Sequence, residues 1–148
     1  MAEKFTKSMA RNIYYGGSFF FLLLLLGLTV DTVRQLPERD HRENITPEVA
    51  HGKELWEKNN CIGCHTLMGE GAYYAPELGN VFNRRGAGNE DAFKTYMRGW
   101  VNAQPLPIPT RRKMPQFNLS DAEIDSLSEF LIWTSRIENN NWPPNIEG

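Results

Sequence analysis

The stretch that decides the fold is CIGCH, residues 61–65, within the longer segment NNCIGCHTLMGEGAYYAP, residues 59–76. It contains the only two cysteines of the chain, and a histidine follows the second one directly. The order C-x-x-C-H is typical of haem c attachment, because two thiols one turn apart can each add to a haem vinyl group while the next imidazole reaches the iron. The sequence therefore predicts one covalently bound haem c, attached at Cys61 and Cys64, with His65 as an axial ligand.

Two other uses of the cysteines stay open at this point. A zinc site usually has four ligands, and beyond the motif only His41 and His51 supply further imidazoles, neither of them in a paired motif. A redox dithiol, or the small ring that a disulfide would close here, usually occurs beside a βαβ unit, which this sequence does not predict. Haem c remains the preferred interpretation.

A second axial ligand must come from elsewhere in the chain, and a methionine thioether is a soft ligand that raises the reduction potential of such an iron. Met68 lies three residues after His65, and that segment spans only about 10 Å when fully extended. Met97 falls on the apolar face of a predicted helix, where a methionine usually fills the core. Met114 precedes Pro115 in an extended stretch that can reach the far side of the haem. We expect Met114 to be the ligand.

An uncharged segment near the N-terminus predicts a membrane anchor. The 19 residues 12–30 are rich in Phe and Leu and would span about 28 Å as a helix. No A-x-A-like cleavage site follows at residues 29–34, so we expect an uncleaved transmembrane helix rather than a signal peptide. Lys4, Lys7 and Arg11 precede the span. Because positively charged flanks stay in the cytoplasm, the rest of the chain is expected in the periplasm of a bacterium, anchored in the inner membrane.

The remaining sequence predicts amphipathic helices and no alternating strand pattern. One helix begins at Thr46-Pro47 with an N-cap followed by proline, a second spans about 90–101, and a third begins at Ser120 with an S-x-x-E capping box. The predicted fold class is all-α, and a bound cofactor would complete a thin core. The predicted divisions are a cytoplasmic tail with the transmembrane helix and its extension (1–36), a linker (37–46), a haem domain (47–138) and a tail (139–148).

The helix before CIGCH, the Met114-Pro115 pair and the capped C-terminal helix together resemble a class I cytochrome c over residues 50–136. That resemblance implies that the first and last helices of the domain cross, with Gly52 and Trp56 near Phe130. It also implies that the backbone carbonyl of Pro76 accepts a hydrogen bond from the ring of the axial histidine.

A closer resemblance covers essentially the whole chain. An N-terminal anchor, then CIGCHTLMGEGAYYAPEL, then RRKMPQF is similar to the cytochrome c subunits of bacterial nitric oxide reductases. The resemblance implies a subunit without a catalytic site of its own. Such a subunit passes electrons from a soluble donor, another cytochrome c or a cupredoxin, to haem b in a large polytopic partner. That partner also holds non-haem iron and reduces NO to N2O in denitrification.

The same resemblance suggests a role for GEGAYY, residues 69–74. In that family this stretch docks on the catalytic subunit, and the carbonyl at the position of Gly71 and the phenol at the position of Tyr73 help to hold a calcium ion between the subunits. Calcium prefers such hard oxygen ligands. The alternative is a solvated loop with two partly buried tyrosines.

Charge is distributed unevenly along the exported part. Of the 16 Lys and Arg and the 18 Asp and Glu residues, three and one respectively precede residue 31, so 13 basic and 17 acidic side chains remain. This balance favours neither nucleic-acid binding nor a domain lying on a membrane surface. Arg111, Arg112 and Lys113 form a basic run beside Met114. We expect either a docking site for an electron donor or solvated charge.

Two further functions compete with the subunit interpretation. One is a free-standing, membrane-anchored cytochrome c that shuttles electrons to terminal oxidases. The other is a haem sensor that binds a gas at an open iron position. Ligation by Met114 argues against the sensor, because it would leave no vacant position on the iron.

Overall fold

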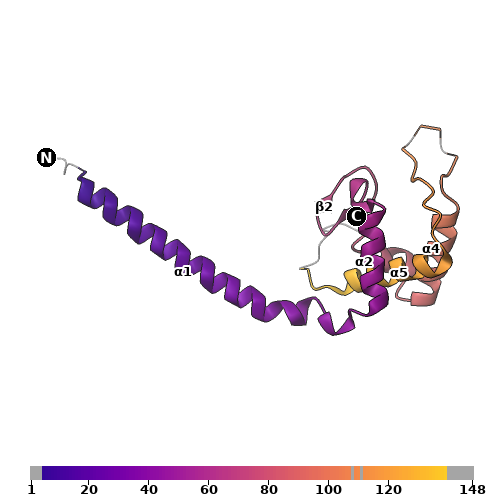
Figure 1. Cartoon of the computed structure of the whole chain (residues 1–148), viewed down its shortest axis with the longest axis horizontal. Coiled ribbons are helices and arrows are strands. Elements are labelled where there is room, and N and C mark those ends of the chain that lie inside the picture. Colours follow the sequence, from indigo (N-terminus) through magenta and orange to yellow (C-terminus); the bar gives the residue numbers. More distant parts are fainter. Residues whose placement is uncertain (1–4, 108, 111, 140–148) are drawn as a thin grey trace. The chain divides into compact units, whose positions relative to one another are not determined.

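The computed structural model describes residues 5–107, 109–110 and 112–139, and it divides into two units, Met1–Glu38 and Arg39–Gly148 (Figure 1). The first unit consists of the helix α1, Lys7–Arg39, whose last residue begins the second unit. This helix is long and apolar enough to cross a membrane, and none of its apolar window is buried in the protein. A buried core helix would show the opposite, so the structure supports the predicted anchor.

The end of α1 differs from the prediction. A helix ending before Pro37 was expected, because the residue before a proline resists helical geometry. The helix instead includes Pro37 and ends at Arg39. Proline lacks a backbone N–H and so removes one intrahelical hydrogen bond, but only Glu38 and Arg39 follow it in α1, so little of the helix lies beyond the disturbance.

In its described residues the second unit is helical, as the predicted all-α class requires, with one very short strand pair. Its elements are η1 (Arg42–Asn44), α2 (Pro47–Lys58), η2 (Cys61–Gly63), β1 (Thr66–Leu67), β2 (Glu70–Gly71), α3 (Val81–Gly86), α4 (Glu90–Asn102) and α5 (Asp121–Arg136). The strands β1 and β2 pair antiparallel, with Thr66 opposite Gly71. The strand pair and α3 were not predicted.

Two of the three predicted helices, α2 and α5, begin at their predicted caps. The Thr46 hydroxyl accepts a hydrogen bond from the N–H of Val49 at 3.3 Å, and Pro47 occupies the first turn of α2. At α5 the Ser120 hydroxyl accepts from the N–H of Glu123 at 3.3 Å, and the Glu123 carboxylate accepts from the N–H of Ser120 at 2.8 Å. These reciprocal bonds satisfy backbone donors that a helix start would otherwise leave unpaired.

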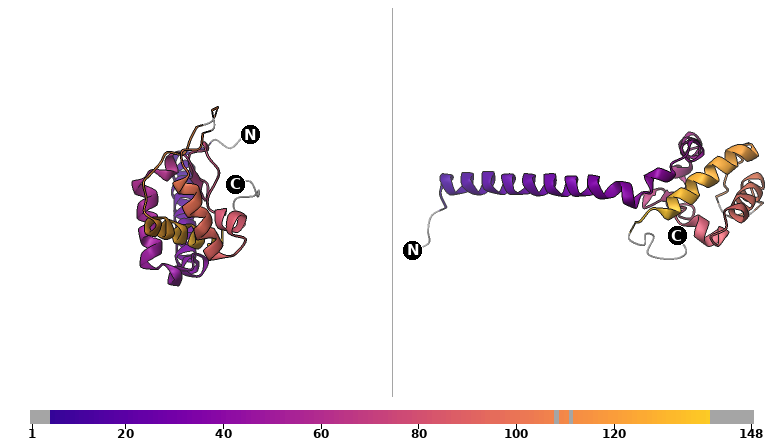
Figure 2. Two further views of the ribbon diagram at one scale, coloured as in Figure 1. Left: turned by 90° about the vertical axis from the view of Figure 1, so that its right-hand side faces the viewer. Right: turned by 90° about the horizontal axis from the view of Figure 1, so that it is seen from below.

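The helices α2 and α5 cross where the resemblance predicted. A Cβ atom at Gly52 would collide with the carbonyl of Ser126 and lie 2.8 Å from Cβ of Phe130, so only glycine permits this close approach. The Trp56 and Phe130 rings lie 6.2 Å apart between centroids. Figure 2 shows α5 passing between α2 on one side and α3 with α4 on the other, in agreement with the contacts among these helices.

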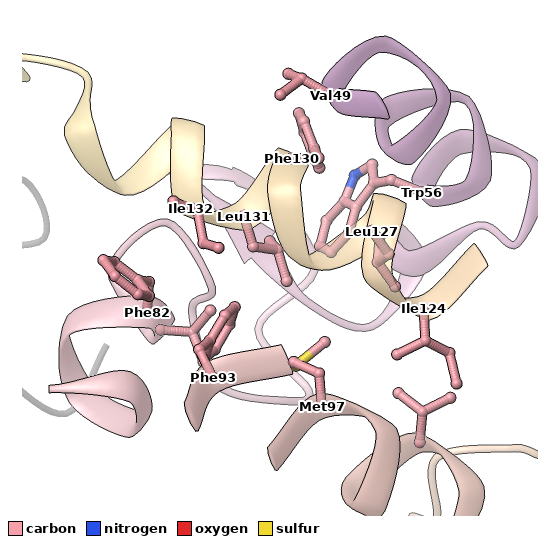
Figure 3. Close-up of a cluster of buried hydrophobic side chains, with 12 residues drawn as sticks. Val49, Trp56, Phe82, Phe93, Met97, Ile124, Leu127, Phe130, Leu131 and Ile132 are labelled. Atoms are coloured by element: carbon pink, nitrogen blue, oxygen red, sulfur yellow. The ribbon is translucent and has the colours of Figure 1, made fainter. Parts of the chain in front are cut away.

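A single apolar cluster fills the space around α5 (Figure 3). Its members are Val49, Trp56, Val81, Phe82, Phe93, Met97, Val101, Ile124, Leu127, Phe130, Leu131 and Ile132. On α4 the buried residues are Phe93, Met97 and Val101, one stripe that faces α5. Trp100, one turn after Tyr96 on the same helix, is 42% exposed, and its ring stacks on that of Tyr96.

Candidate haem-binding site

The helix α2 leads directly into the cysteine motif. After its end at Lys58, Asn60 adopts a left-handed conformation (φ 51°) and turns the chain into η2. The N–H groups of Cys64 and His65 both donate to the carbonyl of Cys61, at 3.1 and 2.9 Å. The motif is therefore wound into one tight turn, as the attachment of two thiols to one macrocycle requires.

The two cysteines are free thiols in different surroundings. Cys61 is partly buried against the apolar cluster, whereas Cys64 is exposed. Burial raises the pKa of the Cys61 thiol to about 11, and the neighbouring Cys64 adds to the effect, while a backbone hydrogen bond opposes it. At neutral pH this thiol is protonated. A partly buried, unpaired thiol next to an exposed one fits a cofactor that covers part of the domain surface.

The ring of His65 is fixed by one hydrogen bond. Its Nδ1 lies 2.8 Å from the carbonyl oxygen of Pro76, the contact that the resemblance implied. Because a carbonyl can only accept, Nδ1 carries the proton and Nε2 keeps a free lone pair for a metal. Burial lowers the pKa of His65, partly offset by the bond to Pro76, and so favours this neutral form. The Trp56 ring, with its centroid 6.4 Å from that of His65, lies beside it.

The structure separates the three methionines considered as ligands. Met97 is 7% exposed and belongs to the central cluster. Met68 lies in the turn between β1 and β2, with φ 50°, and its N–H is bound to the carboxylate of Glu77. Met114 is partly buried at the edge of the cluster, which Cys61 also contacts. Among the three, Met114 alone is outside both the core and the strand turn.

Gly71 occupies a position that only glycine tolerates. Its φ is +113°, and a Cβ atom there would collide with the carbonyl of His65 and lie 2.8 Å from Cγ1 of Ile62. The loop is thus folded tightly against the haem-attachment turn. Tyr73 and Tyr74 are 80% and 64% exposed, so the alternative of two partly buried tyrosines is wrong.

One side chain of the basic run 111–113 is held by an aromatic ring. The guanidinium of Arg112 lies over the ring of Tyr74, 3.8 Å from the centroid. Lys113 is exposed, and Arg111 lies outside the described residues. This contact joins the Met114 segment to the loop that carries Gly71 and Tyr73, two stretches that the sequence treated separately.

The donor set agrees better with haem c than with zinc. Within residues 5–107, 109–110 and 112–139, no three His, Cys, Asp or Glu side chains gather in a way that could hold a metal ion. Two free thiols on one turn, an imidazole with Nε2 available and a thioether packed against the same apolar cluster as Cys61 fit a covalently attached, six-coordinate haem.

Sequence reasoning missed two residues that support the site. Glu77, which follows Pro76, is only 4% exposed and bonds backbone groups around the strand pair. Gln116, two residues after Met114, donates from Nε2 to the carbonyls of Asn102 and Gln104 at 3.2 and 3.1 Å. An acid inside the apolar segment APELG was the available signal for Glu77, and no pattern marked Gln116.

Comparison with known proteins agrees with this geometry. The cytochrome c family matches residues 49–135. Over 148 residues, covering 100% of both chains, the protein is 60% identical to the C subunit of nitric oxide reductase from Stutzerimonas stutzeri. It is 49% identical to the protein of the same name from Paracoccus denitrificans and 47% identical to that of Halomonas halodenitrificans, again over the full length of each. The chain belongs to the cytochrome c family, whose domain carries covalently bound haem c, and within it to the nitric oxide reductase C subunits.

Proposed function

We propose that this chain is the electron-transfer subunit of a nitric oxide reductase, taking electrons from a periplasmic donor and passing them to haem b of a polytopic catalytic subunit. The observation that supports this most directly is the CIGCH turn with the His65 ring already fixed by Pro76. The family of full-length relatives supplies the reaction, the reduction of NO to N2O, which would take place in the partner.

The residues of this chain have distinct tasks in the proposal. Cys61 and Cys64 would hold the macrocycle by thioether bonds, and His65 and Met114 would ligate its iron. When bound, haem c supplies a one-electron ferric–ferrous couple. The Pro76 carbonyl keeps the His65 ring in the tautomer that leaves Nε2 to the iron. Cys61 and Met114 both pack against the apolar cluster, which would give the macrocycle an apolar surface to lie on.

The proposed topology follows from α1 and its flanks. Lys7 and Arg11 lie at the start of the helix, before its uncharged segment, and Lys4 precedes it in the sequence. A basic flank retained in the cytoplasm directs the following domain across the inner membrane. The haem domain then lies in the periplasm, where soluble cytochromes and cupredoxins are available as electron donors.

The segment after α1 argues against a free-standing shuttle. A shuttle that visits several oxidases needs a long, flexible tether. Here the carbonyl of Arg39 accepts a hydrogen bond from the N–H of Glu138 at 2.8 Å, and the carbonyl of His41 accepts one from the Trp133 indole at 3.4 Å. The short segment between α1 and α2 is therefore bound to its own haem domain.

Co-purification separates the subunit from the shuttle. The full-length chain with an affinity tag is extracted from membranes of a denitrifying host in mild detergent. A subunit should retain a polytopic protein that contains haem b and non-haem iron, and the complex should reduce NO when supplied with reduced cytochrome c. Recovery of the chain alone, with intact haem c, would favour the shuttle.

We further propose a calcium ion at the subunit interface, held in part by the Gly71 carbonyl and the Tyr73 phenol. Both residues are exposed, and the tight backbone at Gly71 presents them on one loop. Tyr73→Phe removes one oxygen from an ion that takes six to eight, so the purified complex should lose calcium affinity and electron flow to haem b. The haem c spectrum should not change. Normal calcium content and normal activity in this variant would return Tyr73 to a solvated role.

The basic run is proposed to guide an acidic electron donor. Replacing Arg111, Arg112 and Lys113 together with Gln should slow electron uptake at low salt and flatten its salt dependence, because steering acts through screened charge. Stopped-flow mixing with reduced donors measures this. Rates unchanged at low salt with every donor would contradict a docking role.

A further inference from the structure

The residue that follows Pro76, whose carbonyl binds the His65 ring, has a buried carboxylate. Glu77 is 4% exposed, although an ionised carboxylate is costly to remove from water unless it is paired and hydrogen-bonded. Its Oε1 accepts two backbone hydrogen bonds, from the N–H of Met68 at 3.0 Å and from the N–H of Gly79 at 2.8 Å. One oxygen therefore joins the turn after β1 to the segment that leads into α3.

The surrounding chain leaves room for this carboxylate. A Cβ atom at Gly79 would lie 2.6 Å from Oε1 of Glu77, so a larger residue there would push the oxygen away from the N–H that it accepts. The bond from the N–H of Leu78 to the carbonyl of Thr66, at 2.9 Å, closes the same loop from its other side. Several contacts thus converge on residues 77–79.

Arg84 supplies the countercharge and a second restraint. Its Nη2 donates to the backbone carbonyl of Glu77, and its Nη1 lies 4.0 Å from Oε2 of the same residue. Among the described residues, neither Nη1 nor Oε2 has a hydrogen-bond partner, so these two atoms face each other as charges. Burial lowers the pKa of Arg84, and the negative charge of Glu77 opposes that shift. Oε1 therefore fixes the position of the Glu77 side chain through its hydrogen bonds, and Oε2 presents the negative charge to Arg84.

The peptide between these restraints is the one that holds His65. The carbonyl of Pro76 belongs to the peptide unit that joins Pro76 to Glu77, and it accepts the His65 Nδ1–H. Because a peptide unit is planar, fixing Glu77 through its side chain and its own carbonyl also limits the direction of the Pro76 carbonyl. We infer that Glu77 is a positioning residue, which acts through Pro76 on the orientation and basicity of the His65 ligand.

This inference rests on the proposed haem ligation by His65, and its consequence is electronic as well as structural. A firm hydrogen bond from Nδ1 raises the basicity of the ligating nitrogen and fixes the ring. A more basic ligand stabilises ferric iron, so loosening the Pro76 carbonyl should raise the reduction potential. The loss of a buried negative charge would raise the potential too, so the two effects must be separated.

Two variants separate position from charge. Glu77→Gln keeps an oxygen at the reach of Oε1 but removes the charge, whereas Glu77→Asp keeps the charge but is one methylene too short to accept from both N–H groups. Ser128→Ala is the control for lost stability alone, since this buried hydroxyl bonds the carbonyl of Ile124 within α5 at 2.7 Å. All three are made in the full-length, haem-loaded chain in detergent.

Solvent exchange of the His65 Nδ1–H in the ferrous protein, followed by NMR, is the deciding measurement, with reduction potential and thermal midpoint recorded beside it. Glu77→Asp should speed this exchange about tenfold, as expected for weakening a partly buried hydrogen bond, and should raise the potential. Glu77→Gln should leave exchange close to that of the wild type, and Ser128→Ala should lower only the thermal midpoint.

The opposite pattern would overturn the inference. Faster exchange in Glu77→Gln than in Glu77→Asp would make charge the important property, and unchanged exchange in Glu77→Asp would make the carboxylate merely structural. Failure of the proposed His65 ligation would look different, because the wild-type protein itself would then show no spectrum of a histidine-ligated haem. Should Glu77→Asp fail to retain haem, normal exchange of the His65 Nδ1–H in Glu77→Gln would still be required.

Discussion

The two segments that carry the proposed axial ligands are held in contrasting ways. In residues 65–79 the backbone is bound to itself and to the cysteine turn: Ala72 donates to Ile62, and Tyr74 and Ala75 donate to Cys64. In the described part of 105–119, no backbone-to-backbone hydrogen bond reaches another segment. Side chains hold that segment, through Gln116 and through the Arg112 guanidinium on Tyr74.

This difference suggests that contacts within the chain order the segment around His65, whereas binding of the haem orders the segment around Met114. The His65 ring is held by a hydrogen bond to the backbone of the chain itself, so its orientation depends on the fold around Pro76. The described residues of the Met114 segment, which lie in the loop between α4 and α5 in Figure 1, make no such backbone hydrogen bonds to other segments. We expect the iron–sulfur bond itself to order much of it.

Removing the cysteines should produce the largest effect. Cys61→Ala combined with Cys64→Ala should abolish covalent haem, detected by haem staining after denaturing electrophoresis. Without haem, backbone amides of 105–119 should exchange with deuterium much faster than in the holoprotein, whereas 65–79 should change less, because its bonds come from the chain. Persistent staining would contradict the attachment sites, and equal loss of protection in both segments would contradict the comparison.

Replacement of the thioether ligand should come next. Met114→Ala should remove the weak absorption band at the red end of the spectrum that sulfur ligation gives ferric haem, and it should lower the reduction potential. Met97→Leu is the matched control, because Met97 fills the core and a change of similar volume costs less than about 1.5 kcal/mol. If Met97→Leu abolished the band and Met114→Ala kept it, the ligand assignment would be wrong.

A substitution at Gly71 tests the segment 65–79, which carries His65. Gly71→Ala should destabilise the holoprotein by about 2 kcal/mol or more, since its positive φ and the carbonyl of His65 both oppose a side chain. Denaturant unfolding followed by tryptophan fluorescence measures this. Gly99→Ala, on an exposed part of α4 with no atom within 4 Å of the new Cβ, should instead stabilise by roughly 0.5–1 kcal/mol. Similar costs at both positions would remove the special role of Gly71.

The smallest effect is expected where the two segments meet. Arg112→Gln should weaken the contact with Tyr74 by about 0.5–1 kcal/mol, the usual size of an exposed cation–π interaction. A double-mutant cycle with Tyr74→Leu, read as the stability of Met114 ligation to alkaline or thermal displacement, isolates this energy. Additive single effects would show that the contact does not couple the segments.

Local sequence signals were sufficient for the main helices and for the cofactor. The Thr46 and Ser120 caps marked where α2 and α5 begin, because capping depends on residues only three positions apart. The motif at residues 61–65 indicated haem c for the same reason: the chemistry needs only neighbouring side chains. The anchor followed from an uncharged stretch long enough for a bilayer.

Other features depend on contacts between distant residues, which no local pattern contains. The helix α3 has six residues and no side-chain cap, and Val81 and Phe82 are buried in it by packing against α4 and α5. Trp100 and Val101 are both apolar, and only the direction of α5 decided which would be buried. Glu77 is ionisable and would be expected at the surface, yet two backbone N–H groups and Arg84 compensate its burial. The sequence alone determined which cofactor the chain binds, whereas tertiary structure decided how the histidine proposed as its ligand is held.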